Sequence, residues 1–296
     1  MFEQFRTERI KTSGATIHTR IGGEGPPLLL LHGYPQTHFI WHEIAPHLTD
    51  DFTVVVPDLR GYGDSSKPPS TPDHAPYTKR AMALDLVEVM EALGFGRFSV
   101  AGHDRGGRIT HRMAVDHPQR LEKAAVLDIS PTLTMYERTT MALAQKYWHW
   151  FFLIQEEGVP ETMIGANPEF FLRQHMGRGS AGLSAFKPPA WAEYVRCFTP
   201  EAIHATCEDY RAAATTDLVH DRESRERGER IQCPLLVLWG EHGVIEELFT
   251  PLDDWRAVAT DVRGHALPCG HYLPEEQPEL VLQAFREFFR NARGAI

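Results

Sequence analysis

The segment with the clearest chemical potential runs from Ser99 to Gly107 and reads Ser-Val-Ala-Gly-His-Asp-Arg-Gly-Gly. An apolar run leads into a G-x-D-x-G pattern, and a helix-like stretch follows it. Glycines at this spacing permit a sharp turn and the close approach of the next helix, which leaves the side chain of Asp104 exposed at the turn. A carboxylate held there can attack carbon and form an ester intermediate. Aspartate is also common as a turn residue or helix N-cap, so this pattern alone leaves both interpretations open.

Two further residues complete a set for nucleophilic catalysis. Enzymes with such a turn place the nucleophile, the acid and then the histidine in that chain order. Asp128 ends the apolar run Ala124 to Leu127, where carboxylates at the end of a strand line the crevice of the sheet. His271 lies just before the last predicted helix. We predict that Asp104 is the nucleophile, that His271 activates water, and that Asp128 orients His271 and makes it more basic.

Two arginines stand beside the predicted nucleophile. Arg105 directly follows Asp104, and Arg108 follows within the first helical turn. Guanidinium groups bind carboxylates through paired hydrogen bonds, and their charge also lowers the pKa of a neighbouring carboxyl group. The plainer interpretation of Arg108 is an i,i+4 contact with Asp104 on the helix surface. We infer that both arginines bind a small carboxylic acid with a leaving group on its α-carbon.

The elements that must position these residues alternate between apolar runs and amphipathic stretches. Continuous apolar runs are typical of strands buried on both faces of a parallel sheet. Such runs occur at Pro27–Leu31, Phe52–Val56, Phe98–Ala101, Ala124–Ile129, Pro234–Trp239 and within Ala257–Leu267. Helical stretches are predicted at Tyr77–Leu93, Gly106–His117 and Pro278–Ala292. This alternation predicts an α/β protein with a doubly wound, mostly parallel sheet.

The segment 131–225 breaks that alternation. It is rich in aromatic residues and helix formers, and it has no convincing strand. A stretch of this length between two strands of one sheet requires a folded insertion, because structureless loops that long are rare. We therefore predict a core domain formed by residues 1–130 and 226–296, with a helical cap formed by residues 131–225.

Composition limits the classes of partner. The chain has 296 residues and a formal net charge of −10, which makes a phosphate backbone an unfavourable partner. Apolar stretches are far too short for a membrane span, the amino terminus lacks a signal-peptide pattern, and the four cysteines form no C-x-x-C pair. We expect a cytoplasmic protein with neither nucleic-acid nor membrane partners.

Metal and nucleotide cofactors are not expected either. His38 and His42 have i,i+4 spacing but no acidic companion in a convincing arrangement. The chain also lacks a phosphate-binding glycine loop.

Several motifs together resemble the α/β-hydrolase superfamily over nearly the whole chain. They are His32-Gly33-Tyr34-Pro35, the run Asp58 to Ser65, the G-x-D-x-G turn and Gly270-His271. With aspartate at the turn, the resemblance narrows to haloalkane dehalogenases, epoxide hydrolases and haloacid-cleaving relatives, and it implies the α/β-hydrolase fold.

The chain departs from many of these relatives at the acid. They carry it in a W-G-x-x-D pattern, whereas Trp239 to Gly243 ends in glycine here. The acid role therefore falls to Asp128, with Glu241 and Glu246 as alternatives.

The run Gly102 to Arg108, followed by His111-Arg112-Met113-Ala114, is similar to the fluoroacetate dehalogenases in particular. This resemblance implies hydrolysis of fluoroacetate, or haloacetates more generally, to glycolate and halide. It also implies that the chain forms a homodimer. The residues that the resemblance assigns are three donors to the departing halide, His149, Trp150 and Tyr210, and two backbone oxyanion donors, Tyr34 and Arg105.

Two other functions remain open. An epoxide hydrolase shares the nucleophile and the histidine, and it needs cap tyrosines as acids, for which Tyr147 or Tyr210 could serve. Arg105 argues against an epoxide, because an uncharged substrate offers it no counter-ion. The fold also hosts receptors for small ligands, against which the intact set of Asp104, Asp128 and His271 argues.

Overall fold

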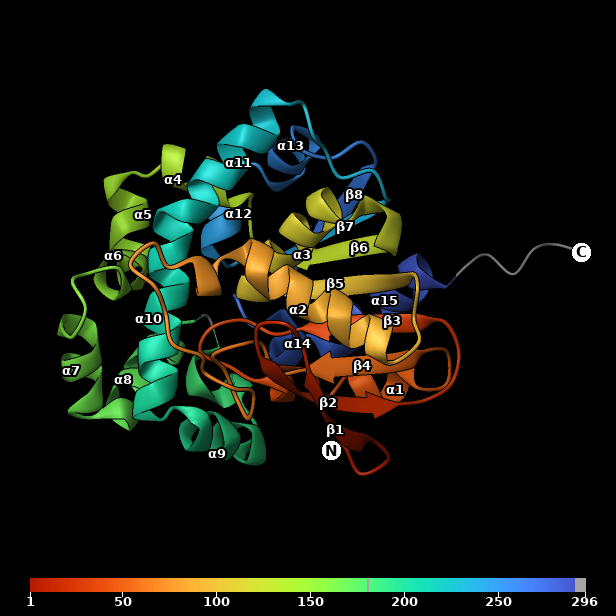
Figure 1. Cartoon of the computed structure of the whole chain (residues 1–296), viewed down its shortest axis with the longest axis horizontal. Coiled ribbons are helices and arrows are strands. Elements are labelled where there is room, and N and C mark those ends of the chain that lie inside the picture. Colours follow the sequence, from red (N-terminus) through yellow and green to blue (C-terminus); the bar gives the residue numbers. More distant parts are fainter. Residues whose placement is uncertain (180, 291–296) are drawn as a thin grey trace, which may run out of the picture.

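The computed structural model describes residues 1–179 and 181–290, and within them the chain forms one eight-stranded sheet (Figure 1). Its strand order is β1-β2-β4-β3-β5-β6-β7-β8. The strands are β1 (Arg6–Lys11), β2 (Thr16–Gly22), β3 (Pro27–Leu31), β4 (Thr53–Pro57), β5 (Phe98–His103), β6 (Leu121–Leu127), β7 (Leu235–Gly240) and β8 (Val262–Leu267). Strand β2 pairs antiparallel with β1 and β4, and all other pairs are parallel. The predicted mostly parallel α/β sheet is confirmed.

Apolar side chains fill both faces of the sheet. Neighbouring residues of a strand point to opposite sides, so Leu29 and Val100 belong to one buried cluster, whereas Leu28 and Ala101 belong to the other. The helices that contribute to the first cluster include α2 (Lys79–Ala92), α3 (Arg105–Asp116) and α13 (Pro251–Arg256). Those that contribute to the second include α1 (Ala45–Leu48) and α15 (Pro278–Phe289). Helices therefore cover both faces, as in a doubly wound sheet.

A series of helices joins β6 to β7, and it gathers at one side of the sheet in Figure 1. These helices are α4 (Thr132–Glu137), α5 (Met141–Lys146), α6 (Trp148–Leu153), α7 (Val159–Gly165), α8 (Pro168–Met176), α9 (Pro188–Cys197), α10 (Pro200–Ala214) and α11 (Thr216–Glu226). The division of the chain into core and cap at residues 130 and 226 stays a prediction. No helix within residues 1–179 and 181–290 is long and apolar enough to cross a bilayer.

Short elements complete the connections around the sheet. They are the helices α12 (Val244–Leu248) and α14 (Leu273–Glu276) and the 3-10 helices η1 (His38–Trp41), η2 (Ala75–Tyr77), η3 (Pro118–Arg120) and η4 (Gly182–Ala185).

The sequence prediction missed the first two strands and misplaced some boundaries. In β1 every residue except Ile10 is charged or polar, because this strand lies at the open edge of the sheet with mostly exposed side chains. In β2 three polar residues in a row separate Ile17 from Ile21, so neither strand has a continuous apolar run. The last strand begins only at Val262, although the predicted range for it started at Ala257, directly after the end of α13 at Arg256. The predicted end of the last helix at Ala292 lies outside the described residues.

Candidate active site

Asp104 forms the whole turn between β5 and α3. The strand ends at His103 and the helix begins at Arg105, so a single residue reverses the chain. Its φ of 46° and ψ of −112° lie in a region that non-glycine residues rarely adopt, at a cost on the order of 1–3 kcal/mol. Glycine on both sides permits this turn, because a Cβ on Gly102 would lie 2.3 Å from the carbonyl carbon of Gly106. The backbone thus places the carboxylate at the carboxyl end of the sheet.

Asp128 and His271 meet at the same end of the sheet. Asp128 directly follows β6, and its Oδ2 lies 2.6 Å from Nδ1 of His271, in the loop after β8. The backbone N–H of Gly240, the last residue of β7, donates to Oδ1 of Asp128 at 3.0 Å. Asp104 and His271 line one cavity. The structure therefore brings the three residues predicted for catalysis together.

The charges of these groups act on one another. Burial alone would raise the pKa of Asp104, but the charges of His271, Arg108 and Arg105 outweigh it and hold that pKa below its usual value. Burial also opposes the charged form of His271, yet its pKa is raised by the hydrogen bond and charge of Asp128 and by the charge of Asp104. Asp104 is therefore ionised at neutral pH, which is the form that a nucleophile requires.

The two alternative acids lie elsewhere. Glu246 accepts a hydrogen bond from Nε1 of Trp239, and Glu241 lies 3.4 Å from Nε2 of His242. Neither contacts His271, whose Nδ1 faces Asp128.

The backbone N–H of Tyr34 donates to Oδ2 of Asp104 at 3.0 Å. Tyr34 follows β3, so this donor reaches the nucleophile from the neighbouring strand end. An oxygen held in this way stays in place while the other oxygen attacks, and it is the atom that becomes negative when an ester at Asp104 is hydrolysed. The second predicted oxyanion donor is the N–H of Arg105. Among the hydrogen bonds of the described residues, none joins this N–H to Asp104.

A cavity of about 120 Å³ opens above Asp104. Aromatic side chains from both parts of the chain form most of its wall. The lining residues include Tyr34, Asp104, His271 and Tyr272 from the strand ends and Tyr147, Trp148, His149, Trp150 and His175 from the helices between β6 and β7. The cationic side chains Lys146 and Arg178 also line the cavity, and the aromatic part of the wall strengthens electrostatic interactions because it is less polarisable by charge than water.

The three residues predicted to bind halide lie together. The ring of Tyr210 lies 5.8 Å from that of His149 and 6.5 Å from that of Trp150, measured between centroids. Its hydroxyl group is buried and has no hydrogen-bond partner among the described residues. The pKa of His149 is held well below its usual value by burial and by the charges of His175 and His271, so its ring is neutral. The cluster offers donors without adding a full charge.

Arg105 is already paired with a carboxylate that the sequence prediction missed. Its Nε and Nη2 donate to the two carboxylate oxygens of Asp209 at 2.9 and 2.6 Å, and its guanidinium lies over the ring of Tyr210. Asp209 is on α10 and also accepts hydrogen bonds from Lys79 and from the hydroxyl of Tyr62, at 2.7 Å for the latter. The charge of Arg105 is therefore balanced before any substrate binds.

Arg108 has no such partner. Its side chain is only 3% exposed, and no carboxylate of the described residues lies at ion-pair distance from it. Its Nη atoms contact the Ser130 carbonyl, the Thr132 hydroxyl and the Met135 sulfur, and its Nε has no partner. Its pKa is lowered because burial and the charge of Arg105 outweigh the attraction of Asp104. The i,i+4 ion pair with Asp104 is absent, so Arg108 is a buried cation in need of an anion.

The structure adds two residues to the site that the sequence analysis did not single out, His175 and Asp209. His175 of α8 lies 4.4 Å from the ring of His149 and lines the cavity, and burial lowers its pKa to about 3. A lone histidine on a helix carries no signal that would have revealed it. Asp209 directly precedes Tyr210, but its partner Lys79 is 130 residues away, so sequence spacing could not connect them.

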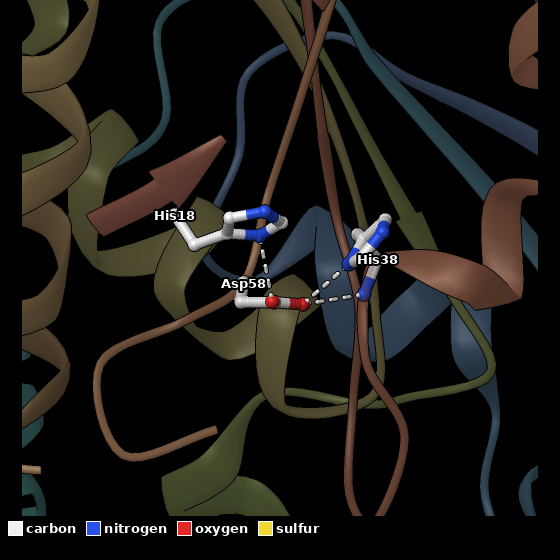
Figure 2. Close-up of side chains that lie close together, drawn as sticks. All are labelled: His18, His38 and Asp58. Carbon is white, nitrogen blue, oxygen red and sulfur yellow. Dashed lines mark hydrogen bonds and ion pairs between the residues drawn. The ribbon is translucent and has the colours of Figure 1, made fainter. Parts of the chain in front are cut away.

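A second cluster of titratable side chains lies apart from the cavity (Figure 2). Nδ1 of His18 lies 3.0 Å from Oδ2 of Asp58, and Nδ1 of His38 lies 2.8 Å from Oδ1. Asp58 also accepts backbone N–H groups, among them that of Asp64 at 2.9 Å. The sequence analysis was wrong to leave His38 without an acidic companion. Because both carboxylate oxygens are used by these donors, the cluster cross-links β2, η1 and the loop after β4.

Comparisons with known proteins show which family the chain resembles. The family model for the α/β hydrolase fold matches residues 26–278. A fluoroacetate dehalogenase from a Burkholderia species is 44% identical over 100% of this chain and 97% of its own length. A soluble epoxide hydrolase from a Corynebacterium species is 32% identical over 95% of this chain and 96% of its own length. A solved structure from Nostoc sp. PCC 7120, named as an α/β hydrolase, has a TM-score of 0.96 and 55% identity, and the match covers 98% of this chain and 100% of that one.

Proposed function

Because the chain belongs to the α/β-hydrolase family, in a branch that contains a dehalogenase, we propose that it hydrolyses the carbon–halogen bond of haloacetates. The proposed substrate is fluoroacetate, and the products are glycolate and halide. The observation that carries this proposal is Arg108, a buried guanidinium that has no carboxylate partner among the described residues and lies beside an ionised Asp104. A substrate that is both an anion and an electrophile satisfies both groups.

Substrate binding follows from the unequal states of the two arginines. Arg108 supplies the counter-charge for the substrate carboxylate. Arg105 is held by Asp209 through Nε and Nη2, so it contributes through Nη1, which makes neither of these bonds. With its carboxylate fixed, the substrate holds its α-carbon in line with Asp104. Such orientation contributes several kcal/mol, on the order of what intramolecular models show.

In the first step Oδ1 of Asp104 displaces the halide from the α-carbon. A carbon–oxygen bond forms as the carbon–halogen bond breaks, and the electron pair of that bond leaves with the halide. His149, Trp150 and Tyr210 donate hydrogen bonds to the departing anion. The unpartnered hydroxyl of Tyr210 supports this role, because a buried donor without a partner gains a hydrogen bond only when the halide forms.

In the second step water hydrolyses the ester. His271, oriented by Asp128, takes a proton from water, and the resulting hydroxide attacks Cγ of Asp104. Negative charge develops on Oδ2, where the N–H of Tyr34 donates, and the backbone N–H of Arg105 is the second proposed donor. The bond between Cγ and the ester oxygen then breaks, and that oxygen takes a proton as it leaves with glycolate. The carboxylate of Asp104 is restored with the water oxygen in it, and the remaining proton passes from His271 to solvent. Asp128 stays ionised and stabilises the imidazolium of His271.

Epoxide hydrolysis is the second candidate, and the cavity wall favours it in one respect. Tyr147 lines the cavity, and Tyr210 has its unpartnered hydroxyl, so two tyrosines are available as acids for an epoxide oxygen. Several relatives are epoxide hydrolases. An epoxide would leave Arg108 without its anion, which is why we place this reaction second.

The test is halide release from fluoroacetate and chloroacetate by the purified protein, with Asp104→Asn as the matched control. We expect many turnovers for the wild type and none for the variant. A single turnover in H₂¹⁸O should place the label in Asp104 and not in glycolate. Chloride release without fluoride release would refute the fluoroacetate assignment. Release of neither halide, with hydrolysis of a small epoxide, would refute the dehalogenase proposal.

Two further expectations accompany this function. The homodimer and the cytoplasmic location stay predictions, and sedimentation of the purified chain tests the first.

A further inference from the structure

One carboxylate holds the backbone on both sides of His271. The N–H of Gly270 donates to Oε2 of Glu276 at 2.8 Å, and the N–H of Tyr272 donates to Oε1 at 3.0 Å. These two residues directly precede and follow His271, so both oxygens of a single side chain bind the same short loop. Glu276 is the last residue of α14, the helix that follows this loop.

Two other hydrogen bonds hold the ring and the backbone carbonyl of His271. Nδ1 of the ring faces Asp128, and Nε2 of His103 donates to the His271 carbonyl at 2.7 Å. Burial lowers the pKa of His103 to about 3, so its ring is neutral and carries one N–H. Asp128 thus sets the direction of the ring, His103 holds the carbonyl, and Glu276 holds the two neighbouring amides.

We propose that Glu276 is a positioning residue for the hydrolytic half of the reaction. By fixing the amides of Gly270 and Tyr272, it places Nε2 of His271 where it can activate the water that attacks the Asp104 ester. This inference rests on the proposed covalent cycle. The first step needs Asp104 and the halide donors but no base, so the displacement of halide should not depend on Glu276.

A purely structural role makes a different prediction. The bond to Tyr272 alone resembles a carboxylate that reaches back to the N-cap residue of its own helix. Such a cap would affect stability and no particular step. The bond to Gly270 lies outside the helix and ties the loop from its other side, which a cap does not require.

The first experiment follows both steps in Glu276→Gln. Glutamine keeps the size of the side chain, but its NH₂ group cannot accept a hydrogen bond, so one of the two amides loses its partner. Rapid mixing with chloroacetate gives the rate of halide release, and intact mass of quenched samples gives the fraction of protein that carries the ester. We expect halide release within about threefold of the wild type, hydrolysis slowed by about 10- to 100-fold, and accumulation of ester, because small displacements of a catalytic group have effects of this size.

The pH profile supplies a second signature. The charged and titratable groups around His271 include Asp104, His103, Asp128, Tyr272, Glu276, His149 and His175. The side chains of Lys146, Tyr147, Arg178, His242 and Glu247 also line the cavities that His271 lines. The charge of Glu276 helps to raise the pKa of His271, and Gln at 276 removes that charge. Because the base acts in its neutral form, the acidic limb of the hydrolysis rate should shift to lower pH in Glu276→Gln.

The adjacent Glu275 provides the matched control. Its carboxyl accepts hydrogen bonds from Nε2 of Gln36 at 2.5 Å and from the hydroxyl of Tyr194 at 2.9 Å, and it does not hold the His271 loop. Burial raises its pKa well above the usual value. In its neutral form one oxygen is a donor, as the NH₂ group of glutamine is, and the buried Oε1 of Gln36, which has no partner among the described residues, can accept from either when that amide turns. We expect both steps of Glu275→Gln to match the wild type.

The outcomes separate this inference from the function on which it rests. Wild-type hydrolysis of the ester in Glu276→Gln would overturn the positioning role, and so would equal slowing of both steps. A wild-type protein that forms no ester with either haloacetate would instead refute the proposed covalent cycle.

Discussion

Replacing the two arginines beside Asp104 by methionine should have unequal effects on stability. Methionine has a similar length and no charge. In Arg105→Met, the carboxylate of Asp209 loses two charge-assisted hydrogen bonds and keeps Lys79 and Tyr62 as partners. Breaking one side of a buried ion pair costs about 3–5 kcal/mol, and Lys79 does not restore the two hydrogen bonds that the buried carboxylate loses. At about 2–4 °C per kcal/mol, this variant should melt roughly 6–20 °C below the wild type.

Arg108→Met leaves no carboxylate without a partner. Its charge is disfavoured in the free protein, as its lowered pKa indicates, and its unpartnered Nε is removed with it. The variant loses the contacts to Ser130 and Thr132, two weak hydrogen bonds of 3.4 and 3.1 Å, and the guanidinium over the ring of Trp150. Each such hydrogen bond contributes about 0.5–1.5 kcal/mol, which roughly offsets the relief from desolvation. We expect unfolding free energy within about 1 kcal/mol of the wild type, and at least about 2 kcal/mol above that of Arg105→Met.

The substitution Arg108→Met should lower the activity on an anionic substrate. A charge-assisted contact to the substrate carboxylate is worth about 2–4 kcal/mol, so kcat/KM for chloroacetate should fall about 30- to 700-fold in Arg108→Met. Chloroacetamide, which is uncharged, should lose less than about threefold. Chemical denaturation and chloride release measure the two effects in one preparation. Equal loss of stability in both arginine variants, or equal loss of activity on both substrates, would refute a substrate-binding role for Arg108.

Three other changes test the remaining groups. Burial raises the pKa of Glu275 in the folded state above its unfolded value of 4.5. The folded protein therefore has its full stability from this group below pH 4.5 and loses it as the pH rises through the folded-state pKa. Because glutamine stays neutral, Glu275→Gln should gain stability over the wild type in melts from pH 5 to pH 8. His271→Ala should release one halide per site and retain the ester, visible by mass, whereas absence of any burst would show that this residue also acts in the first step. Tyr210→Phe should slow fluoride release by about 10- to 100-fold and chloride release less, because fluoride concentrates its charge more strongly; equal slowing would remove the hydroxyl from the halide site.

The parts of the site that could be predicted carry their information locally. The turn at Asp104 needs glycines within a few residues, and the strand before it is a continuous apolar run. Both signals can be read from a short window. Asp128 and His271 could be placed because the carboxyl ends of parallel strands meet at one edge of a sheet, whatever the distance along the chain.

The missing parts depend on contacts that no window contains. Asp209 acts on Arg105 only because α10 packs against the start of α3, and the sequence shows neither the packing nor the pairing. For this reason Arg105 and Arg108, which are three residues apart and look equivalent in the sequence, differ in whether a carboxylate pairs with them in the structure. Arg105 is neutralised from the helices between β6 and β7, and Arg108 is left for an anion.

The position of the acid shows how a departure from a family pattern can be understood physically. Gly243 stands where many relatives carry the aspartate, and a Cβ at this position would lie 3.4 Å from Oδ1 of Asp128. A second carboxylate there would place two like charges at one imidazole, and their repulsion would force a proton onto one of them. The ends of β6 and β7 therefore offer alternative places for a single acid. Because the chain has Asp128 at the end of β6, glycine at 243 leaves His271 with that one carboxylate as the partner of its Nδ1.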